Sequence, residues 1–424
     1  MGAMKLKGKK VTVLGLGRSG LAAANFLLSQ KAVVSISDCR DGKALRRNLN
    51  LLRPGKLAEV EIGKHSRALI KSRDLIIASP GIPLNAAPFV WANKMGIPVI
   101  GEIELAYRFC PAAIIAVTGT NGKTTVSTLI GEIFRKAGKK FSVCGNIGIP
   151  FSAELPGLSA DHTVVLEISS FQLDTIEQFR PKVAVLLNLS ADHLDRYEDF
   201  EQYLSAKMRI FRNQSQEDWA VINADDPRKL KLAAGTKAKI VYFSKDAAGQ
   251  YPGLNSNHLA ALAASELFGI QRSVAVKACR KFKGIAHRLE QVGEIKGVQF
   301  VNDSKATNIQ STLWALDYIK RPIILIAGGR DKGSDFSIAR EKLARRLKAM
   351  VLLGEAREKI ASSFKGALTL RRAKDLEQAV DKAYALARRG DCVLLSPMCA
   401  SFDMFRDYAE RGRVFRKIVQ GLLV

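Results

Sequence analysis

The chain has 424 residues, a hydrophobic content of 47% and a formal net charge of +26. This length exceeds that of one ordinary domain, and the hydrophobic content is that of a folded protein rather than a disordered chain. No apolar run reaches the length of a membrane span, and the first residues lack the apolar core of a secretion signal. We therefore expect a cytoplasmic protein that does not enter a membrane.

The positive charge is distributed along the whole chain and forms neither a basic arm nor a low-complexity block. Aromatic residues make up 7% of the chain and do not alternate with the basic runs as a base-stacking surface requires. These features argue against nucleic acid as a partner and favour a small polyanionic substrate. The six cysteines include no pair with CxxC spacing, which argues against a zinc site or a disulfide framework.

The predicted elements fall into three segments, and strands alternate with helices in each, which predicts parallel, doubly wound α/β sheets. The first segment has strands at 10–14, 33–37, 75–78 and 99–100, with a helix over 21–28. The second has strands at 114–117, 164–168, 183–187, 220–222 and 240–243, with a helix over 123–137. The third has strands at 300–301, 323–327, 350–353 and 392–395. We expect three α/β domains in series, covering residues 1–101, 102–285 and 286–424.

In the first segment, Gly15-Leu16-Gly17-Arg18-Ser19-Gly20 follows a strand, and the next strand ends at Asp38. This pattern resembles a dinucleotide-binding fingerprint, which would favour an NAD-dependent oxidoreductase if it stood alone. A second phosphate-binding loop later in the chain argues against that reading. The same geometry can hold any diphosphate, including that of a UDP-sugar.

The second segment opens with Gly119-Thr120-Asn121-Gly122-Lys123-Thr124-Thr125 between a strand and a helix. Glycines there let backbone N–H groups approach phosphates, Lys123 can reach the β- and γ-phosphates, and the Thr124 hydroxyl can bind Mg²⁺. The full phosphate-loop pattern needs glycine at position 117, where valine stands. The alternative is a tight turn between strand and helix.

Three further residues of this segment are candidate metal ligands. Glu167 ends an apolar strand, where a carboxylate can bind a metal or else cap the following helix. His193 lies among carboxylates just past another strand, where a structural role is the alternative. Lys207, four residues after Tyr203, is by pattern alone an exposed helix lysine.

The third segment places polar groups after three strands. These groups lie at 302–308, at 328–332 and at 396–403. Because the carboxyl ends of parallel strands meet at one edge of a sheet, we expect a common binding edge. Arg and Lys there can hold phosphate and carboxylate groups.

Together, these motifs resemble the Mur ligase family along essentially the whole chain. The resemblance rests on residues 119–125, 167–173, 192–197, His287-Arg288, 303–308 and 396–403. It is greatest to members that join D-glutamate to UDP-N-acetylmuramoyl-L-alanine through an acyl phosphate, with ATP as co-substrate, in peptidoglycan synthesis. The resemblance implies a Rossmann-like UDP-binding domain, a central P-loop ATPase-like domain and a C-terminal Rossmann-like domain. It also implies two Mg²⁺ sites and a monomer.

The resemblance assigns residues to each ligand. The UDP-substrate would contact Gly17, Arg18, Ser19, Gly20, Asp38, Ser79, Gly81, Asn146 and His193. ATP would contact residues 119–125, with Asn257, Arg288 and Asp303. One Mg²⁺ would be held by Thr124 and Glu167, the second by His193 and a carbamylated Lys207. Lys123, His193 and Lys207 would be catalytic. The amino acid would contact Lys305, Thr307, Lys332, Ser401, Phe402 and Tyr408.

The chain departs from the family at one place and leaves rivals open. Residues 245–256 are a short form of a stretch in which the family carries a His-Asn pair, and Gly253-Leu254 stand in its place. Adenine contacts and nucleotide affinity are therefore in question. A sister ligase that adds another amino acid is the nearest rival, although its Asp-Asn-Pro-Arg motif has a counterpart only at 225–228, in the central segment. A binding protein of the same fold is the second rival.

Overall fold

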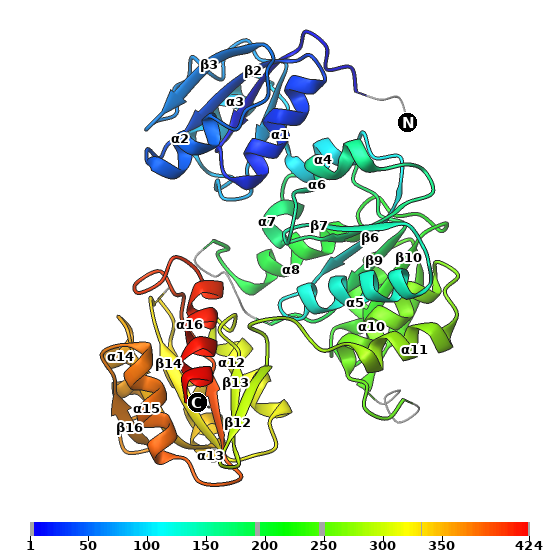
Figure 1. The fold of residues 1–424 in the computed structure, drawn as a ribbon. Coiled ribbons are helices and arrows are strands. Elements are labelled where there is room, and N and C mark those ends of the chain that lie inside the picture. Colours follow the sequence, from blue (N-terminus) through cyan, green and yellow to red (C-terminus); the bar gives the residue numbers. More distant parts are fainter. Residues whose placement is uncertain (1–3, 191–195, 246–250, 332, 423–424) are drawn as a thin grey trace. The chain divides into compact units, whose positions relative to one another are not determined.

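The computed structural model describes residues 4–190, 196–245, 251–331 and 333–422 (Figure 1). The described residues form three α/β sheets within two compact units, Met1–Phe282 and Lys283–Val424. The predicted fold class, three α/β domains with parallel sheets, is confirmed. The domain boundaries at 101/102 and 285/286 stay a prediction.

The first sheet has the order β3-β2-β1-β4-β5, and its paired strands are parallel. Its strands are β1 (Lys10–Leu14), β2 (Val33–Asp38), β3 (Leu57–Ile62), β4 (Leu75–Ala78) and β5 (Val99–Gly101). The helices α1 (Arg18–Ser29), α2 (Lys43–Leu49) and α3 (Ala87–Lys94) connect them. The sequence pattern does not predict β3, because this edge strand is largely exposed and has no continuous apolar run.

The central sheet has the order β11-β10-β9-β6-β8-β7 and is parallel throughout. Its strands are β6 (Ala113–Thr118), β7 (Phe141–Gly145), β8 (Thr163–Glu167), β9 (Val183–Leu186), β10 (Trp219–Asn223) and β11 (Lys239–Phe243). Its helices are α4 (Glu102–Tyr107), α5 (Lys123–Lys136), α6 (Phe151–Glu154), α7 (Ser170–Leu173), α8 (Phe200–Met208), α9 (Lys229–Ala234), α10 (Ser256–Glu266) and α11 (Arg272–Lys281), with short 3₁₀ turns η1 (Leu155–Gly157) and η2 (Arg209–Phe211).

The third sheet has the order β12-β13-β17-β14-β15-β16. Its strands are β12 (Glu290–Ile295), β13 (Val298–Asn302), β14 (Ile323–Gly328), β15 (Leu347–Leu353), β16 (Thr369–Arg372) and β17 (Cys392–Leu395). Its helical elements are α12 (Ile309–Tyr318), η4 (Phe336–Ala339), α13 (Arg340–Arg346), α14 (Arg357–Ser363), α15 (Leu376–Leu386) and α16 (Tyr408–Gly421). Strand β12 is antiparallel to β13 because Lys296 and Gly297, with φ of +47° and +78°, make a two-residue hairpin turn.

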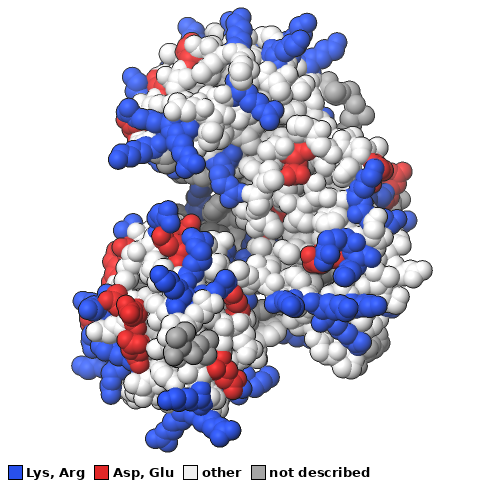
Figure 2. All heavy atoms as spheres, in the orientation of Figure 1, with Lys and Arg blue, Asp and Glu red and all other residues white. Residues whose placement is uncertain are grey.

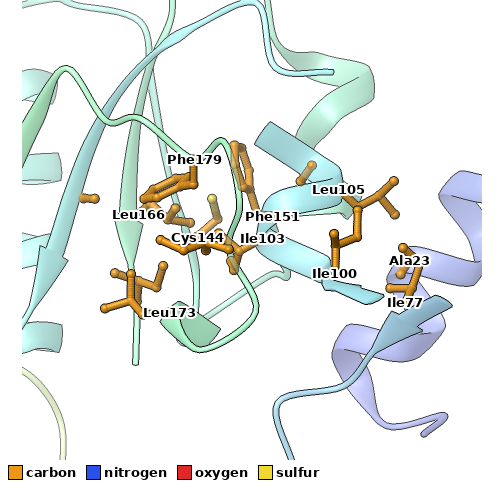
Figure 3. Packing of buried hydrophobic residues seen from close by; sticks show 14 of the residues in the cluster. Ala23, Ile77, Ile100, Ile103, Leu105, Cys144, Phe151, Leu166, Leu173 and Phe179 are labelled. Carbon is orange, nitrogen blue, oxygen red and sulfur yellow. The ribbon is translucent and has the colours of Figure 1, made fainter. Parts of the chain in front are cut away.

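One of the hydrophobic clusters of the unit Met1–Phe282 runs through both of its sheets (Figure 3). Ala23 of α1 and Ile77 of β4 pack near Ile100 of β5. Helix α4 continues the core through Ile103. Phe151 then leads to the residues under the central sheet. Since each large apolar side chain gains about 1.5–3 kcal/mol on burial, this core holds the first and central sheets in one unit.

The charged surface agrees with the even distribution of basic residues in the sequence. On the face drawn in Figure 2, Lys and Arg side chains are spread over the molecule and Asp and Glu lie between them. Among the described residues, no helix combines the length and the apolar character that crossing a bilayer requires.

Candidate functional site

The loop at residues 119–122 joins β6 to the N-terminus of α5, as the sequence predicts. Gly119 and Gly122 have φ of +148° and +86°, values that favour glycine. A Cβ atom at Gly122 would lie 2.5 Å from Asn257 Oδ1, so the first turn of α10 packs directly on the loop. A glycine-rich loop at the start of a 14-residue helix has the geometry that binds phosphate.

Residues after β9 hold this loop in shape. Asn188 accepts a hydrogen bond from the Asn121 N–H at 2.8 Å and donates one to the Asn121 carbonyl at 2.9 Å. The Thr120 hydroxyl lies 3.1 Å from the Tyr203 hydroxyl, and it also accepts from the Ser190 N–H at 3.1 Å. Asn188 was not predicted as a site residue, although it follows an apolar strand as Glu167 does.

Two lysines meet at the loop. Lys123 Nζ donates to the carbonyls of Gly119 and Thr120 at 2.8 and 2.9 Å. Lys207 Nζ donates to the same Gly119 carbonyl at 3.1 Å and lies 4.6 Å from the centre of the Tyr203 ring. Lys207 is only 2% exposed, so the pattern-based reading of an exposed helix lysine is wrong. Thr124 and Thr125 follow Lys123 in the first turn of α5.

Glu167 ends β8 and is 1% exposed. Its Oε1 accepts a hydrogen bond from Asn146 Nδ2 at 2.8 Å, while its Oε2 is buried and has no hydrogen-bond partner among the described residues. The alternative that Glu167 caps the next helix is wrong, because Ser169 caps α7 in a capping box with Gln172. A buried carboxylate oxygen without a hydrogen-bond partner fits a cation.

Two predicted site residues, His193 and Lys332, lie outside the described residues. Within the described ranges, no three His, Cys, Asp or Glu side chains gather as a metal site. The predicted ligand sets do not require such a cluster, because they combine one carboxylate with a hydroxyl, and one imidazole with a modified lysine.

The loop at residues 15–20 joins β1 to α1, which begins directly after Gly17 with Arg18 and Ser19. A Cβ atom at Gly20 would lie 1.8 Å from the Gly15 carbonyl oxygen, so only glycine fits at this close approach. Gly17 has no other atom within 4 Å of its Cβ position, which leaves space over the loop. This is the arrangement expected of a diphosphate-binding turn.

Asp38 is 2% exposed at the end of β2, and its Oδ2 accepts from the Leu16 N–H at 2.8 Å. Burial alone would raise the pKa of Asp38, but hydrogen bonds from Arg40 and from the backbone outweigh it and lower the pKa. Arg40 binds both carboxylate oxygens at 3.1 Å. Arg40, which was not predicted as a site residue, contributes to this lowering of the Asp38 pKa.

The turn Ser79–Ile82, called the substrate turn because the resemblance assigns Ser79 and Gly81 to the UDP-substrate, follows β4 and reaches the same loop. Ser79 Oγ donates to the Gly15 carbonyl at 2.8 Å. The Arg18 guanidinium contacts the Gly148 carbonyl, in the loop that carries Asn146. The structure thus brings together the residues that the resemblance assigns to the UDP-substrate, His193 excepted.

In the unit Lys283–Val424, the three predicted loops follow β13, β17 and β14, which are neighbours in the sheet. Asp303 Oδ2 accepts from Ser396 Oγ at 2.9 Å, and Oδ1 accepts from the Leu289 N–H at 3.3 Å. Burial raises the pKa of Asp303 to about 7, although the nearby Arg288 charge acts in the opposite direction. Asp303 therefore titrates near neutral pH.

Those predicted amino-acid residues that the structure describes share this edge. Lys305 Nζ lies 3.7 Å from the centre of the ring of Tyr408, the first residue of α16. Thr307 lies two residues after Lys305. Ser401 is buried, whereas Phe402 is 61% exposed.

Arg411 of α16 is a residue that the sequence analysis missed. Its guanidinium is 2% exposed and donates to Ser304 Oγ at 2.9 Å, to the Ser304 carbonyl at 2.8 Å and to the Cys399 and Ala400 carbonyls. Burial lowers its pKa to about 10. Arg411 thus joins the loop at 303–308 to the loop at 396–403.

Comparison with known proteins gives full-length matches. Sequence models of the Mur ligase MurD-like N-terminal domain, the Mur ligase middle domain and the Mur ligase glutamate ligase domain match residues 9–101, 117–270 and 287–399. The UDP-N-acetylmuramoylalanine–D-glutamate ligase of Koribacter versatilis is 41% identical over 447 residues, which cover 98% of each chain. The protein of that name from Acidobacterium capsulatum is 43% identical and covers 98% of this chain and 97% of its own.

Solved structures agree in fold. UDP-N-acetylmuramate–alanine ligase MurC of Thermotoga maritima has a TM-score of 0.60 at 20% identity and covers 97% of this chain and 99% of its own. MurF ligase of Thermotoga maritima, solved in complex with ADP, has a TM-score of 0.61 at 19% identity and covers 95% and 99%. With matches of family domains along the chain and relatives above 40% identity over nearly its whole length, the chain belongs to the Mur ligase family.

Proposed function

We propose that the chain joins D-glutamate to the L-alanyl carboxylate of UDP-N-acetylmuramoyl-L-alanine, with conversion of ATP to ADP and phosphate. The full-length identity of 41–43% to ligases of that name is the observation that carries the proposal. The site chemistry supports it, because a phosphate loop and a diphosphate loop lie in one compact unit.

The reaction follows from the charges of its parts. A carboxylate is a poor electrophile, so its oxygen first attacks the γ-phosphorus of ATP and ADP leaves. The amine of D-glutamate then attacks the acyl carbon, loses a proton, and phosphate leaves. Lys123, the first residue after the phosphate loop, offsets the negative charge that accumulates as one anion attacks another.

Magnesium fits the residues present. Thr124 and Glu167 would hold one ion, and the buried Glu167 oxygen without a partner supports this assignment. His193 and carbamylated Lys207 would hold the second. When bound, the ions neutralise phosphate charge and align the reacting oxygens. Lys207 and Lys123 donate to the same carbonyl oxygen, so their two positive charges lie close together. A carbamate on Lys207 would replace one of these cations by an anion, which supports the assignment.

The contacts to the nucleotide and to the amino acid are also proposed from the resemblance to the family. Asn257, Arg288 and Asp303 serve the nucleotide, and Asn257 is supported by its contact with the loop. Lys305, Thr307, Lys332, Ser401, Phe402 and Tyr408 serve the amino acid. We propose that the enzyme acts as a monomer in the cytoplasm.

A product assay tests the function. Purified protein receives ATP, Mg²⁺, UDP-N-acetylmuramoyl-L-alanine and one member of a panel of D- and L-amino acids. We expect release of phosphate, and a product with the mass of the D-glutamyl adduct, only when the UDP-substrate and D-glutamate are both present. Ligation of a different amino acid in place of D-glutamate would assign the chain to a sister activity.

A further inference from the structure

Arg196 binds the substrate turn with three hydrogen bonds. Its Nη2 donates to the Pro80 and Ile82 carbonyls at 3.1 and 2.7 Å, and its Nη1 donates to the Gly81 carbonyl at 3.2 Å. The turn follows β4 of the first sheet, whereas Arg196 precedes α8 of the central sheet. Arg196 therefore donates hydrogen bonds to three consecutive carbonyls of the substrate turn.

The substrate turn is in turn hydrogen-bonded to the loop at residues 15–20. Ser79 precedes the three carbonyls and donates from its hydroxyl to the Gly15 carbonyl. A Cβ atom at Gly15 would lie 3.1 Å from Ser79 Cβ and Oγ, so the two segments are in close contact. The turn that Arg196 binds is therefore in direct contact with the start of the loop at 15–20.

On its other side, Arg196 is in contact with a row of aromatic rings that ends at the phosphate loop. Its guanidinium lies 4.6 Å from the centre of the Phe171 ring, and the Tyr197 ring stacks on Phe171 at 5.8 Å. Tyr197 lies 5.6 Å from Tyr203, whose hydroxyl is 3.1 Å from the Thr120 hydroxyl. Packed side chains thus connect the substrate turn with the phosphate loop without a gap.

We propose that Arg196 is a positioning residue that fixes the substrate turn relative to the phosphate loop, so that the substrate carboxylate meets the γ-phosphate. The inference rests on the proposed ligase function. Two anions must be held in line for the first step, and a displacement of about 1 Å can cost a factor of about 100 in rate. Only arginine presents several donors in a fixed plane, so lysine cannot replace the three hydrogen bonds.

Steady-state kinetics of Arg196→Ala and Arg196→Lys test the role. We expect kcat to fall by about 100-fold, and KM for the UDP-substrate to rise several-fold, in both variants. KM for ATP should change less than about twofold, because the phosphate loop keeps its own contacts with Asn188. Full rescue by Arg196→Lys, or an equal change in both KM values, would overturn the proposal.

Arg346→Ala provides a matched control. Arg346 also donates to two backbone carbonyls, those of Leu316 and Ile319, but within the other unit and away from the predicted loops. Arg346→Ala should lower the melting temperature and leave the KM values for the UDP-substrate and for ATP unchanged. If Arg196→Ala behaves like this control, Arg196 has a structural role only.

Two further measurements keep the inference separate from the proposed function. If the wild-type chain fails to ligate D-glutamate, the function is wrong. Calorimetric titration with UDP-N-acetylmuramoyl-L-alanine and with ATP then still decides whether Arg196→Ala weakens the first ligand alone, as the inference requires. If Arg196→Ala does not fold, Phe171→Leu removes the ring beside the guanidinium and should give the same kinetic split.

Discussion

Lys123 and Lys207 donate hydrogen bonds to one and the same acceptor, the carbonyl oxygen of Gly119, at 2.8 and 3.1 Å. Their ammonium nitrogens are therefore no more than about 6 Å apart, and at an effective dielectric constant of about 20 two like charges at this distance repel by roughly 3 kcal/mol. Lys207 is buried, so water screens this repulsion poorly. A carbamate on Lys207 would turn the repulsion into attraction.

The first prediction concerns this pair. Lys207→Ala should lower the ligation rate by about 100-fold or more, and formate, acetate or propionate should partly restore it, because a small carboxylate can occupy the place of the carbamate. Lys123→Ala should lose a similar rate, but added carboxylate should not restore it, since Lys123 acts as a cation. Rates are measured against carboxylate concentration for both variants. Equal responses of the two would contradict a carbamate at position 207.

The second prediction concerns Glu167 as a magnesium ligand. Glu167→Gln keeps the shape and can still accept from Asn146, but it removes the charge. We expect the rate at saturating substrates to fall by roughly 100-fold and the Mg²⁺ concentration for half-maximal rate to rise. The measurement is a titration of initial rate with Mg²⁺.

Glu102→Gln is the control for this experiment. Glu102 Oε2 is also buried without a hydrogen-bond partner among the described residues, and burial raises the pKa of this carboxyl. Glu102 is not among the predicted magnesium ligands, so Glu102→Gln removes no ligand. The Mg²⁺ dependence should stay that of the wild type. If Glu102→Gln and Glu167→Gln change it equally, the effect arises from lost packing and not from a lost ligand.

Much of the fold was predictable because buried strands of parallel sheets are short apolar runs. Strands β1, β6, β8 and β14 are of this kind, and each was predicted to within two residues. Strands β3 and β16 were not predicted, because they are edge strands with exposed side chains and their pairing depends on neighbours that are distant in sequence.

Site residues were predictable where they follow a strand within a motif. They were unpredictable where their side chains bind backbone carbonyls that are distant in sequence. Glu167 and Asp303 belong to the first kind. Arg196 and Arg411 belong to the second, because arginines that bind carbonyls of other loops leave no local pattern in the sequence. Burial of Lys207 was likewise invisible to pattern alone, since helix periodicity does not show that a loop covers it.

The third prediction uses two glycines of one motif. Gly20→Ala places a Cβ 1.8 Å from the Gly15 carbonyl, so the backbone must move, at a cost of about 3 kcal/mol or more. Gly17→Ala meets no atom within 4 Å and keeps an ordinary φ of −73°, so its melting temperature should equal that of the wild type. It should nevertheless weaken binding of the UDP-substrate, because the new methyl group fills the space over the loop. Thermal melts and calorimetric titrations separate these effects. A destabilised Gly17→Ala would contradict the assignment of that space to a ligand.

The fourth prediction concerns pH and Asp303, whose pKa is raised to about 7 by burial. Between pH 4 and pH 7 the unfolded chain has lost this proton while the folded chain keeps it, so the contribution of Asp303 to stability is full below pH 4 and declines as pH rises to 7. Asp303→Asn removes this dependence. Relative to wild type, the variant should gain roughly 2–3 kcal/mol in free energy of unfolding between pH 5 and pH 7.

The readout for Asp303 comes from tryptophan fluorescence. The chain has three tryptophans, and in a Trp91→Phe, Trp219→Phe background Trp314 reports on the unit Lys283–Val424 alone. Urea unfolding followed at Trp314 gives the free energy at each pH. Asp381→Asn is the control, since this exposed carboxylate on α15 is solvated in both states and its loss should leave the pH dependence of the wild type. If Asp303→Asn also keeps that dependence, the carboxyl of Asp303 is charged throughout the range, and the hydrogen bond from Ser396 outweighs its burial.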